Sequence, residues 1–301
     1  MQKTLISIIG STGIGKTKLA IEMAKHFGTE IISCDSRQFF KEMKIGTATP
    51  TDEELAQAKH HFIGHLSVQD YYSIGQYEED ALEKIEEIFE KNDFAVLVGG
   101  SMMYEKAVVE GLNDLPEANA ENQEKLQKIL DEEGLEKLQE ILKNLDEEYY
   151  NVVHKENPRR LLRAIDVIWQ TGRKYSEIIA EPKHKRDFKV IRIGITAPRE
   201  IMYERINLRV DKMLENGLID EVKSLTKYQN LVPLQTVGYT EIFKYLEGTW
   251  DLDFAVEEIK KNSRRYAKRQ ETWNRKVENV TWLPYDYSEE QLHEILSKIE
   301  K

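Results

Sequence analysis

Eight consecutive residues near the start of the chain have the composition of a phosphate-binding loop. They follow an apolar run and precede a helical pattern, and they are Gly10, Ser11, Thr12, Gly13, Ile14, Gly15, Lys16 and Thr17. In this G-x4-G-K-T pattern the backbone N–H groups point inward at a chain of phosphates, the lysine reaches the outer phosphates and the threonine hydroxyl can ligand Mg²⁺. The pattern predicts a phosphate site, but it does not say whose phosphates the site holds.

One carboxylate stands where an acceptor would approach those phosphates. Asp35 follows the apolar run 30–34, at the carboxyl edge of a predicted parallel sheet beside the loop. Motor and switch proteins usually carry an acid after a further apolar strand, whereas here the run 94–98 leads into Gly99, Gly100 and Ser101. Asp35 is therefore suited to bind a nucleophile or to remove its proton. Capping of a following helix is the structural alternative.

Positive charge gathers in two predicted helices, although the net charge of the chain is -11. The first carries Arg159, Arg160 and Arg163 on one face and apolar residues on another. The second is the most basic segment of the chain, with Tyr266 and Trp273 among Lys260, Lys261, Arg264, Arg265, Lys268, Arg269, Arg275 and Lys276. Such segments suit RNA phosphates and splayed bases, while ordinary solvated helix faces are the alternative.

Two further arginines lie in a third predicted helix. Arg205 and Arg209 are four residues apart, so they share one face of that helix. Either side chain can return to the phosphate loop and stabilise a departing anion, and a structural salt bridge is equally open for one of them.

The elements that must position these residues form an α/β core interrupted by helices. Apolar, partly β-branched runs predict buried parallel strands at 4–9, 30–34, 94–98 and 189–195. Helical patterns connect them, and a charged stretch with leucine and isoleucine at helical spacing predicts an inserted helical domain. We therefore expect a P-loop NTPase-like parallel sheet, built from residues 1–115 and 189–301 with a C-terminal basic helix, and a helical insertion at 116–188.

Composition excludes several other classes of protein. The net charge excludes a uniformly basic surface that coats nucleic acid, and the single cysteine, Cys34, excludes an internal disulfide or a cysteine-cluster zinc site. No apolar run approaches the roughly 20 residues of a membrane span, and the N-terminus lacks the layout of a signal peptide. We expect a cytoplasmic protein without a membrane partner, and a monomer, since one chain supplies every proposed part.

Seven motifs, in this order, resemble the tRNA dimethylallyltransferase family. They are GSTGIGKT, Asp35-Ser-Arg-Gln38, Gly99-Gly100-Ser101-x-x-Tyr104, Asn157-Pro-Arg-Arg160, Glu204-Arg-Ile-x-x-Arg-Val-Asp211 with Met213-Leu214 and Gly217-Leu218, Gln235-Thr-Val-Gly-Tyr-x-Glu241, and Lys268-Arg-Gln-x-Thr-Trp273. Together they extend over nearly the whole chain and are specific, whereas the loop alone is not.

The resemblance implies transfer of a dimethylallyl group from dimethylallyl diphosphate to N6 of adenosine 37 beside the tRNA anticodon, assisted by Mg²⁺. Residues 10–17 would hold the diphosphate and Thr17 the metal. Thr12 and Arg209 would contact the diphosphate near the breaking bond, and Arg205 is the alternative to Arg209 for that contact. Asp35 would take the N6 proton. The implied tRNA contacts, with the helical insertion gripping the anticodon stem, are Asp35, Ser36, Arg37, Gln38, Ser101, Arg159, Arg160, Arg163, Gln235, Gly238, Tyr239, Lys268 and Arg269.

The chain departs from the family pattern without losing a proposed catalytic group. The usual Pro-Thr-Ala-Ser of the loop is Ser11-Thr12-Gly13-Ile14, and Met102 replaces a glycine in the turn after Gly99. An adenylate isopentenyltransferase with a free-nucleotide acceptor and a P-loop small-molecule kinase are the alternatives. The long insertion and the basic segments favour tRNA, because a small acceptor does not need them.

Overall fold

The computed structural model describes residues 2–300, which fold as two compact units. Unit 1 comprises Met1–Val109 and Arg186–Lys301, and unit 2 comprises Glu110–Lys185. None of the helices within residues 2–300 has both the length and the apolar character required to cross a bilayer.

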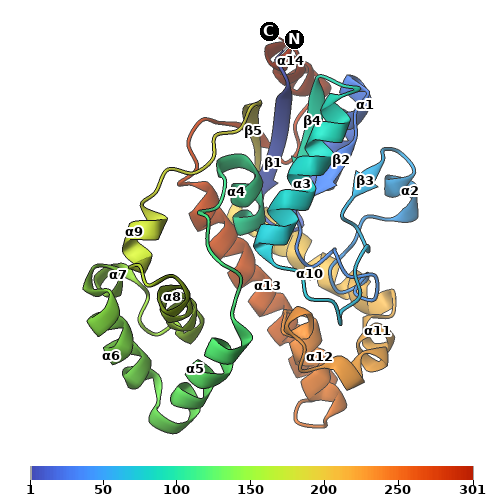
Figure 1. The fold of residues 1–301 in the computed structure, drawn as a ribbon. Helices are drawn as coiled ribbons and strands as arrows, with labels where there is room; N and C mark the ends of the chain where they lie inside the picture. The colour runs from blue at the N-terminus through green and yellow to red at the C-terminus, as the bar shows by residue number, and fades with distance from the viewer. Residues whose placement is uncertain (1, 301) are drawn as a thin grey trace. The chain divides into compact units, whose positions relative to one another are not determined.

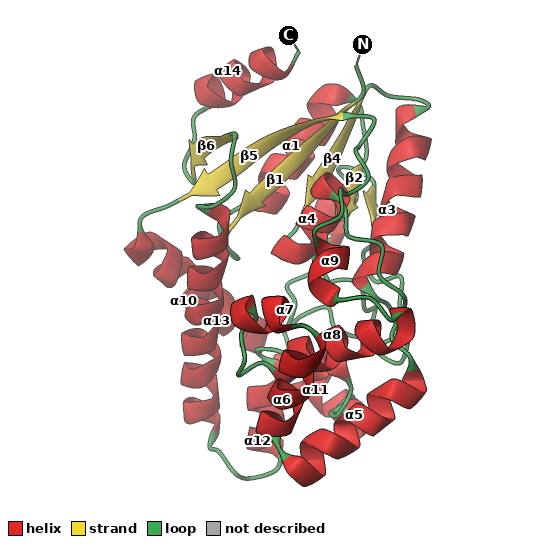
Figure 2. Cartoon of the chain, turned by 60° about the vertical axis from the view of Figure 1, so that its left-hand side comes forward, coloured by secondary structure: helices red, strands yellow, loops and turns green. Residues whose placement is uncertain are grey.

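Unit 1 is built on a six-stranded parallel sheet, which Figure 2 shows in yellow. Its strands are β1 (Thr4–Gly10), β2 (Ile31–Ser33), β3 (His60–His61), β4 (Phe94–Val98), β5 (Lys189–Thr196) and β6 (Val280–Pro284). Their order is β3-β2-β4-β1-β5-β6, so β1 lies between β4 and β5. This confirms the predicted parallel α/β sheet, including a last strand that the run NVTWLP at 279–284 indicates. The two-residue strand β3 was not expected, because so short a strand leaves no periodic signal.

Both faces of the sheet are covered, as alternate residues of its strands require. Ile6 and Ile8 of β1 pack with α1 (Lys16–Phe27) and α14 (Glu289–Ile299), while Leu5 packs on the opposite face with α3 (Ile74–Phe89). The other helices of unit 1 are α2 (Asp52–Leu55), α4 (Met102–Glu110), α10 (Arg199–Glu215), α11 (Leu218–Ser224), α12 (Tyr239–Leu246) and α13 (Leu252–Asn274), with 3-10 turns at Thr226–Tyr228 and Val232–Leu234.

Unit 2 is entirely helical, as the spacing of its leucines predicts. Its helices, drawn from green to yellow in Figure 1, are α5 (Ala120–Glu133), α6 (Leu135–Leu145), α7 (Glu147–Val152), α8 (Pro158–Thr171) and α9 (Tyr175–Ile179). Leu126, Leu138 and Leu142 are fully buried together with Leu161 and Ile165 of α8. The apolar stripe of this segment is therefore a small core of its own.

Candidate active site at the phosphate loop

The loop between β1 and α1 has the conformation of an anion cradle. Gly13 and Gly15 adopt φ of +75° and +113°, which side chains other than glycine rarely accept, and α1 begins at Lys16. The first N–H groups of α1 therefore lack helical partners and favour an anion. The Lys16 ammonium donates to the carbonyl oxygens of Gly10 at 3.0 Å and Ser11 at 2.9 Å. Burial lowers its pKa to about 8, and the nearby Asp35 carboxylate opposes that shift.

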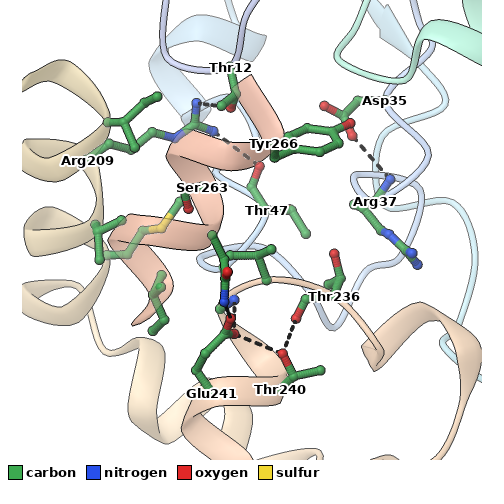
Figure 3. Close-up of a pocket in the computed structure, with 18 of the residues that line it drawn as sticks. Thr12, Asp35, Arg37, Thr47, Arg209, Thr236, Thr240, Glu241, Ser263 and Tyr266 are labelled. Carbon is green, nitrogen blue, oxygen red and sulfur yellow. Dashed lines mark hydrogen bonds between the residues drawn. The ribbon is translucent and has the colours of Figure 1, made fainter. Parts of the chain in front are cut away.

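Two cavities meet at this loop. The loop cavity, of about 610 Å³, is lined by residues 12–18 and by side chains that include Arg205 and Lys212. The acceptor cavity, of about 520 Å³, is lined by Ser36, Ser101, Tyr266 and parts of α10, α12 and α13, and Figure 3 shows a pocket whose labelled residues all belong to this lining. Among residues 2–300, three line both cavities, namely Thr12, Asp35 and Arg209. These are the three residues for which the resemblance implies a catalytic role.

Arg209 of α10 is fixed at this junction. Its Nη1 donates to the Thr12 hydroxyl at 3.2 Å and its Nη2 to the carbonyl of Thr47 at 3.3 Å, as Figure 3 shows. Burial lowers the pKa of the guanidinium, and Asp35 partly restores it. Arg205 instead donates through Nε to the carbonyl of Gly13 at 2.9 Å and lines the loop cavity alone. Both arginines return to the loop, but only Arg209 touches both cavities.

Asp35 starts a turn and does not cap a helix. Its Oδ1 accepts from the backbone N–H of Arg37 at 3.2 Å, and its carbonyl accepts from the N–H of Gln38 at 2.9 Å, so the segment after β2 is a hydrogen-bonded turn. Beside it, the Ser36 N–H and hydroxyl lie 3.0 and 2.9 Å from the Ser101 hydroxyl. The helix-capping alternative is wrong, and the carboxylate lies in the walls of both cavities.

Arg37 and Gln38 organise loops around the site. Arg37 donates to the carbonyls of Val232 and Pro233, at 3.3 and 3.1 Å, and lines the acceptor cavity. Gln38 donates to the carbonyls of Thr47 and Ala48 and lines the loop cavity. Thr47 thereby receives hydrogen bonds from Gln38 and Arg209.

The segment 235–241 is divided between cavity and core. Gln235 and Gly238 line the acceptor cavity, and Gly238 donates its N–H to the buried Glu241 at 2.8 Å. Tyr239, which we expected at the RNA, has no exposed surface, because its ring packs against Gly46 and its hydroxyl donates to Glu221 at 2.7 Å. A fully buried ring cannot reach an acceptor, so Tyr239 supports the site from within.

Glu221 is the partner that holds this part of the wall. Its two oxygens accept the backbone N–H groups of residues 44, 45 and 46 at 2.7–2.9 Å, in addition to the Tyr239 hydroxyl. The loop that leads to Thr47 is therefore tied to α11 by one carboxylate.

The basic helix α13 has two parts with different roles. In its first half Lys260 pairs with Asp211 at 2.8 Å, and Lys261 pairs with Glu258 at 2.6 Å, so these charges are neutralised locally. Its last turns form a groove lined by Arg265, Lys268, Arg269, Thr272, Trp273 and Lys276, and Arg269 also lines the acceptor cavity. Lys268 and Arg269 are exposed there, as an RNA contact requires.

Of the basic residues of α8 in unit 2, Arg159 and Arg160 are exposed, but Arg163 is not free. Arg163 Nη1 lies 3.3 Å from Oδ2 of the fully buried Asp166, and Nη2 donates to the carbonyl of Pro116. The expected cluster of three arginines for an anionic partner is thus reduced to two, since a buried carboxylate requires a cation beside it.

Gln270 of α13 is a site residue that the sequence reasoning missed. It follows Lys268 and Arg269, whose charges drew attention, yet Ala267, Gln270 and Asn274 recur at helical spacing and are all buried. That periodicity was the available signal. Its side chain joins the phosphate loop to the Gly99–Gly100 turn.

Thr17 is the expected protein ligand for a divalent cation here. Within residues 2–300 there is no group of three or more His, Cys, Asp or Glu residues able to hold a metal. Mg²⁺ needs few protein ligands, because it retains waters and is commonly held by one or two protein oxygens together with substrate phosphates. The Thr17 side chain belongs to the lining of the loop cavity and supplies such an oxygen.

Comparison with known proteins places this chain in a family. The model of the IPP transferase family matches residues 38–277. The chain is 50% identical over 300 residues to a tRNA dimethylallyltransferase of Christiangramia forsetii, covering 99% of each chain, and 45% identical to tRNA dimethylallyltransferase 1 of Bacteroides thetaiotaomicron, covering 93% of this chain and 91% of the relative.

Solved structures show the same likeness. A full-length tRNA isopentenylpyrophosphate transferase from Bacillus halodurans has a TM-score of 0.73 and 35% identity, covering 99% of this chain and 96% of its own. A eukaryotic dimethylallyltransferase, whose structures were determined acting on tRNA, has a TM-score of 0.85 and 26% identity, covering 99% of this chain and 78% of its own.

Proposed function

The chain belongs to the IPP transferase family, and we propose on that basis that it transfers a dimethylallyl group from dimethylallyl diphosphate to N6 of adenosine 37 in tRNA. The observation that carries the proposal is the junction of the loop cavity and the acceptor cavity at Thr12, Asp35 and Arg209. Two substrates that enter from the two cavities would meet at these three side chains.

The loop cavity is assigned to the diphosphate of the donor. The N–H groups at the start of α1, the Lys16 ammonium and Arg209 present positive charge where a diphosphate needs it. An anion in the loop would compete with the carbonyls of Gly10 and Ser11 for the Lys16 ammonium. It would also raise the lowered pKa of Lys16, so the lysine would remain protonated in the complex.

Asp35 is assigned to the acceptor amine. In the reaction the C–O bond between the allylic carbon and the diphosphate breaks, a C–N bond to N6 forms, and the diphosphate leaves with the bonding electrons. The N6 proton then passes to Asp35, and such transfers to a positioned base typically contribute about 10²- to 10⁴-fold. Adenine N6 is a weak nucleophile, so alignment at Thr12 and Asp35 matters as much as proton removal.

Mg²⁺ is assigned to the same cradle, with the Thr17 hydroxyl as its protein ligand. When bound, the ion would neutralise charge on the departing diphosphate. The residues of the chain would do the remaining work, because Lys16 and Arg209 stabilise the same charge from other directions.

RNA contacts are assigned to exposed cations. Lys268 and Arg269 line the groove at the end of α13, where Trp273 offers a stacking surface. In the insertion, Arg159 and Arg160 of α8 are exposed, and we assign to them the backbone of the anticodon stem. The target adenosine would leave its stack to enter the acceptor cavity.

The test is transfer of labelled dimethylallyl from its diphosphate to an anticodon stem-loop RNA with adenosine at position 37. The reaction is run with Mg²⁺ and with AMP as a competing acceptor, for the parent protein, Asp35→Asn, and Asp187→Asn as a control at an exposed acid of unit 1. We expect label on the RNA, a loss of about 10²- to 10⁴-fold in Asp35→Asn and parental rates in the control. Label on AMP alone would indicate a free-nucleotide enzyme, and no label on either acceptor would favour the kinase alternative.

A further inference from the structure

The amide of Gln270 is buried at the centre of the site and uses both of its ends. The side chain has no exposed surface. Its Oε1 accepts the backbone N–H of Thr12 at 2.8 Å, and its Nε2 donates to the carbonyl of Gly100 at 2.8 Å. One side chain on α13 thus joins two loops that are far from it in the sequence.

The bond to Thr12 determines which groups of the loop face the cavities. The Thr12 N–H is already hydrogen-bonded to Gln270, and the Thr12 hydroxyl is the group that meets Arg209. Without this bond the peptide before Thr12 would be free to rotate, and the hydroxyl would lose its fixed direction. A misplacement of about 1 Å at a reacting group can cost about 100-fold in rate.

The bond to Gly100 acts on the opposite wall. Gly100 is in close contact with Asp35, since an atom at its Cβ position would lie 2.9 Å from Oδ2 of that carboxylate and 3.1 Å from Nε2 of Gln270. The Gly100 carbonyl is held from two directions, by Gln270 and by the Tyr266 hydroxyl at 3.0 Å. The surface against which Asp35 rests is therefore fixed by α13.

We propose that Gln270 is a positioning residue that sets the distance and orientation between Thr12 and Asp35, the two groups placed on either side of the reacting atoms. The inference rests on the proposed function, since it assumes that these residues act on one reaction. Gln270 lies in the wall of the acceptor cavity beside them, and we assign to it no direct chemical step.

A purely structural role for Gln270 predicts a different effect of its replacement on turnover. If Gln270 only fills the interior, its replacement lowers stability but leaves the turnover of folded protein unchanged. If it positions Thr12 and Asp35, kcat falls in protein that is fully folded, while the KM for RNA changes little, because the exposed Lys268 and Arg269 are untouched.

Two variants separate these cases. Gln270→Met keeps the length of the side chain and removes both hydrogen bonds. Gln270→Glu keeps the shape and an acceptor for the Thr12 N–H, but it can donate to the Gly100 carbonyl only when the new carboxyl group is protonated. Gln57→Met, on an exposed glutamine of unit 1, is the matched control. The parent enzyme is tested first for modification of the RNA. A parent that does not modify RNA contradicts the proposed function, whereas the comparison of the variants with an active parent tests the role of Gln270.

Turnover and the melting temperature are measured for each protein, and turnover is measured well below the melting temperature. We expect kcat of Gln270→Met to fall by about 10- to 100-fold. For Gln270→Glu, the ratio of its kcat to the parent's kcat should rise as the pH is lowered, because the new carboxyl group donates to the Gly100 carbonyl only when it is protonated. Parental kcat in folded Gln270→Met, or a pH-independent ratio in Gln270→Glu, would overturn the proposal. If Gln270→Met does not fold, the isosteric Gln270→Glu decides alone.

Discussion

Replacing Gly100 by alanine tests the geometry of the reacting groups with a single methyl group. The backbone of Gly100 is outside the left-handed region, so alanine adopts it without strain. The new Cβ would lie 2.9 Å from Asp35 Oδ2, where ordinary contacts begin at 3.4 Å, and 3.1 Å from Gln270 Nε2. Asp35 must therefore retreat by about half an ångström, or the turn must shift by as much.

The expected effect on rate exceeds the effect on stability. Overpacking of this kind typically costs about 1–3 kcal/mol of folding free energy. Since a 1 Å misplacement can cost about 100-fold in rate, we expect kcat of Gly100→Ala to fall by about 10- to 100-fold. The KM for dimethylallyl diphosphate should change less than kcat, because the atoms nearest to the new Cβ belong to Asp35 and Gln270 and not to Lys16.

The assay is steady-state transfer to the stem-loop RNA, with thermal melting in parallel. Gly75→Ala is the matched control, because its Cβ would meet only Ser73 Oγ at 3.7 Å, an ordinary contact, within α3. That variant should keep parental kcat and gain about 0.5–1 kcal/mol of stability, since alanine is favoured over glycine in a helix. A Gly100→Ala enzyme that turns over within twofold of the parent would refute the placement of Asp35 at the reacting amine.

Three further predictions follow from the same structure. Because burial lowers the pKa of Lys16 to about 8, the ammonium is lost above that pH, so affinity for inorganic diphosphate, measured by calorimetry, should fall as the pH rises from about 7 to about 9. Lys16→Arg should abolish that fall, and a pH-independent affinity in the parent would contradict the assignment. Glu221→Gln should lower the free energy of unfolding, measured in urea, by about 2–4 kcal/mol. The reason is that the new NH2 group would face two of the four donors that now hydrogen-bond to the carboxylate. An unchanged urea midpoint of unfolding would contradict this. The double change Lys268→Gln with Arg269→Gln should raise the KM for RNA and reduce the slope of log affinity against log salt by about 1–2, whereas an unchanged slope would exclude both from phosphate contact.

Local patterns were sufficient for the framework of this protein. A phosphate loop is a continuous segment, so its glycines, Lys16 and Thr17 are visible in eight letters, and the structure gives Gly13 and Gly15 the positive φ that only glycine readily adopts. Strands and amphipathic helices follow from periodicities of two and 3.6 residues, which reflect burial of one face. The parallel sheet and the helical insertion were therefore predictable, as was the family from the order of its motifs.

The tertiary structure decided which side chains meet. Thr12 is 197 residues from Arg209 and 258 from Gln270, and no local pattern encodes a pairing across such separations. Arg205 and Arg209 share a helix face, so only packing of α10 against the loop distinguishes them. Arg163 and Tyr239 have types typical of RNA contacts, yet one pairs with Asp166 and the other is buried. In each case the sequence determined the chemistry that a side chain can offer, and the fold determined its neighbours, because burial and partners depend on residues that are distant along the chain.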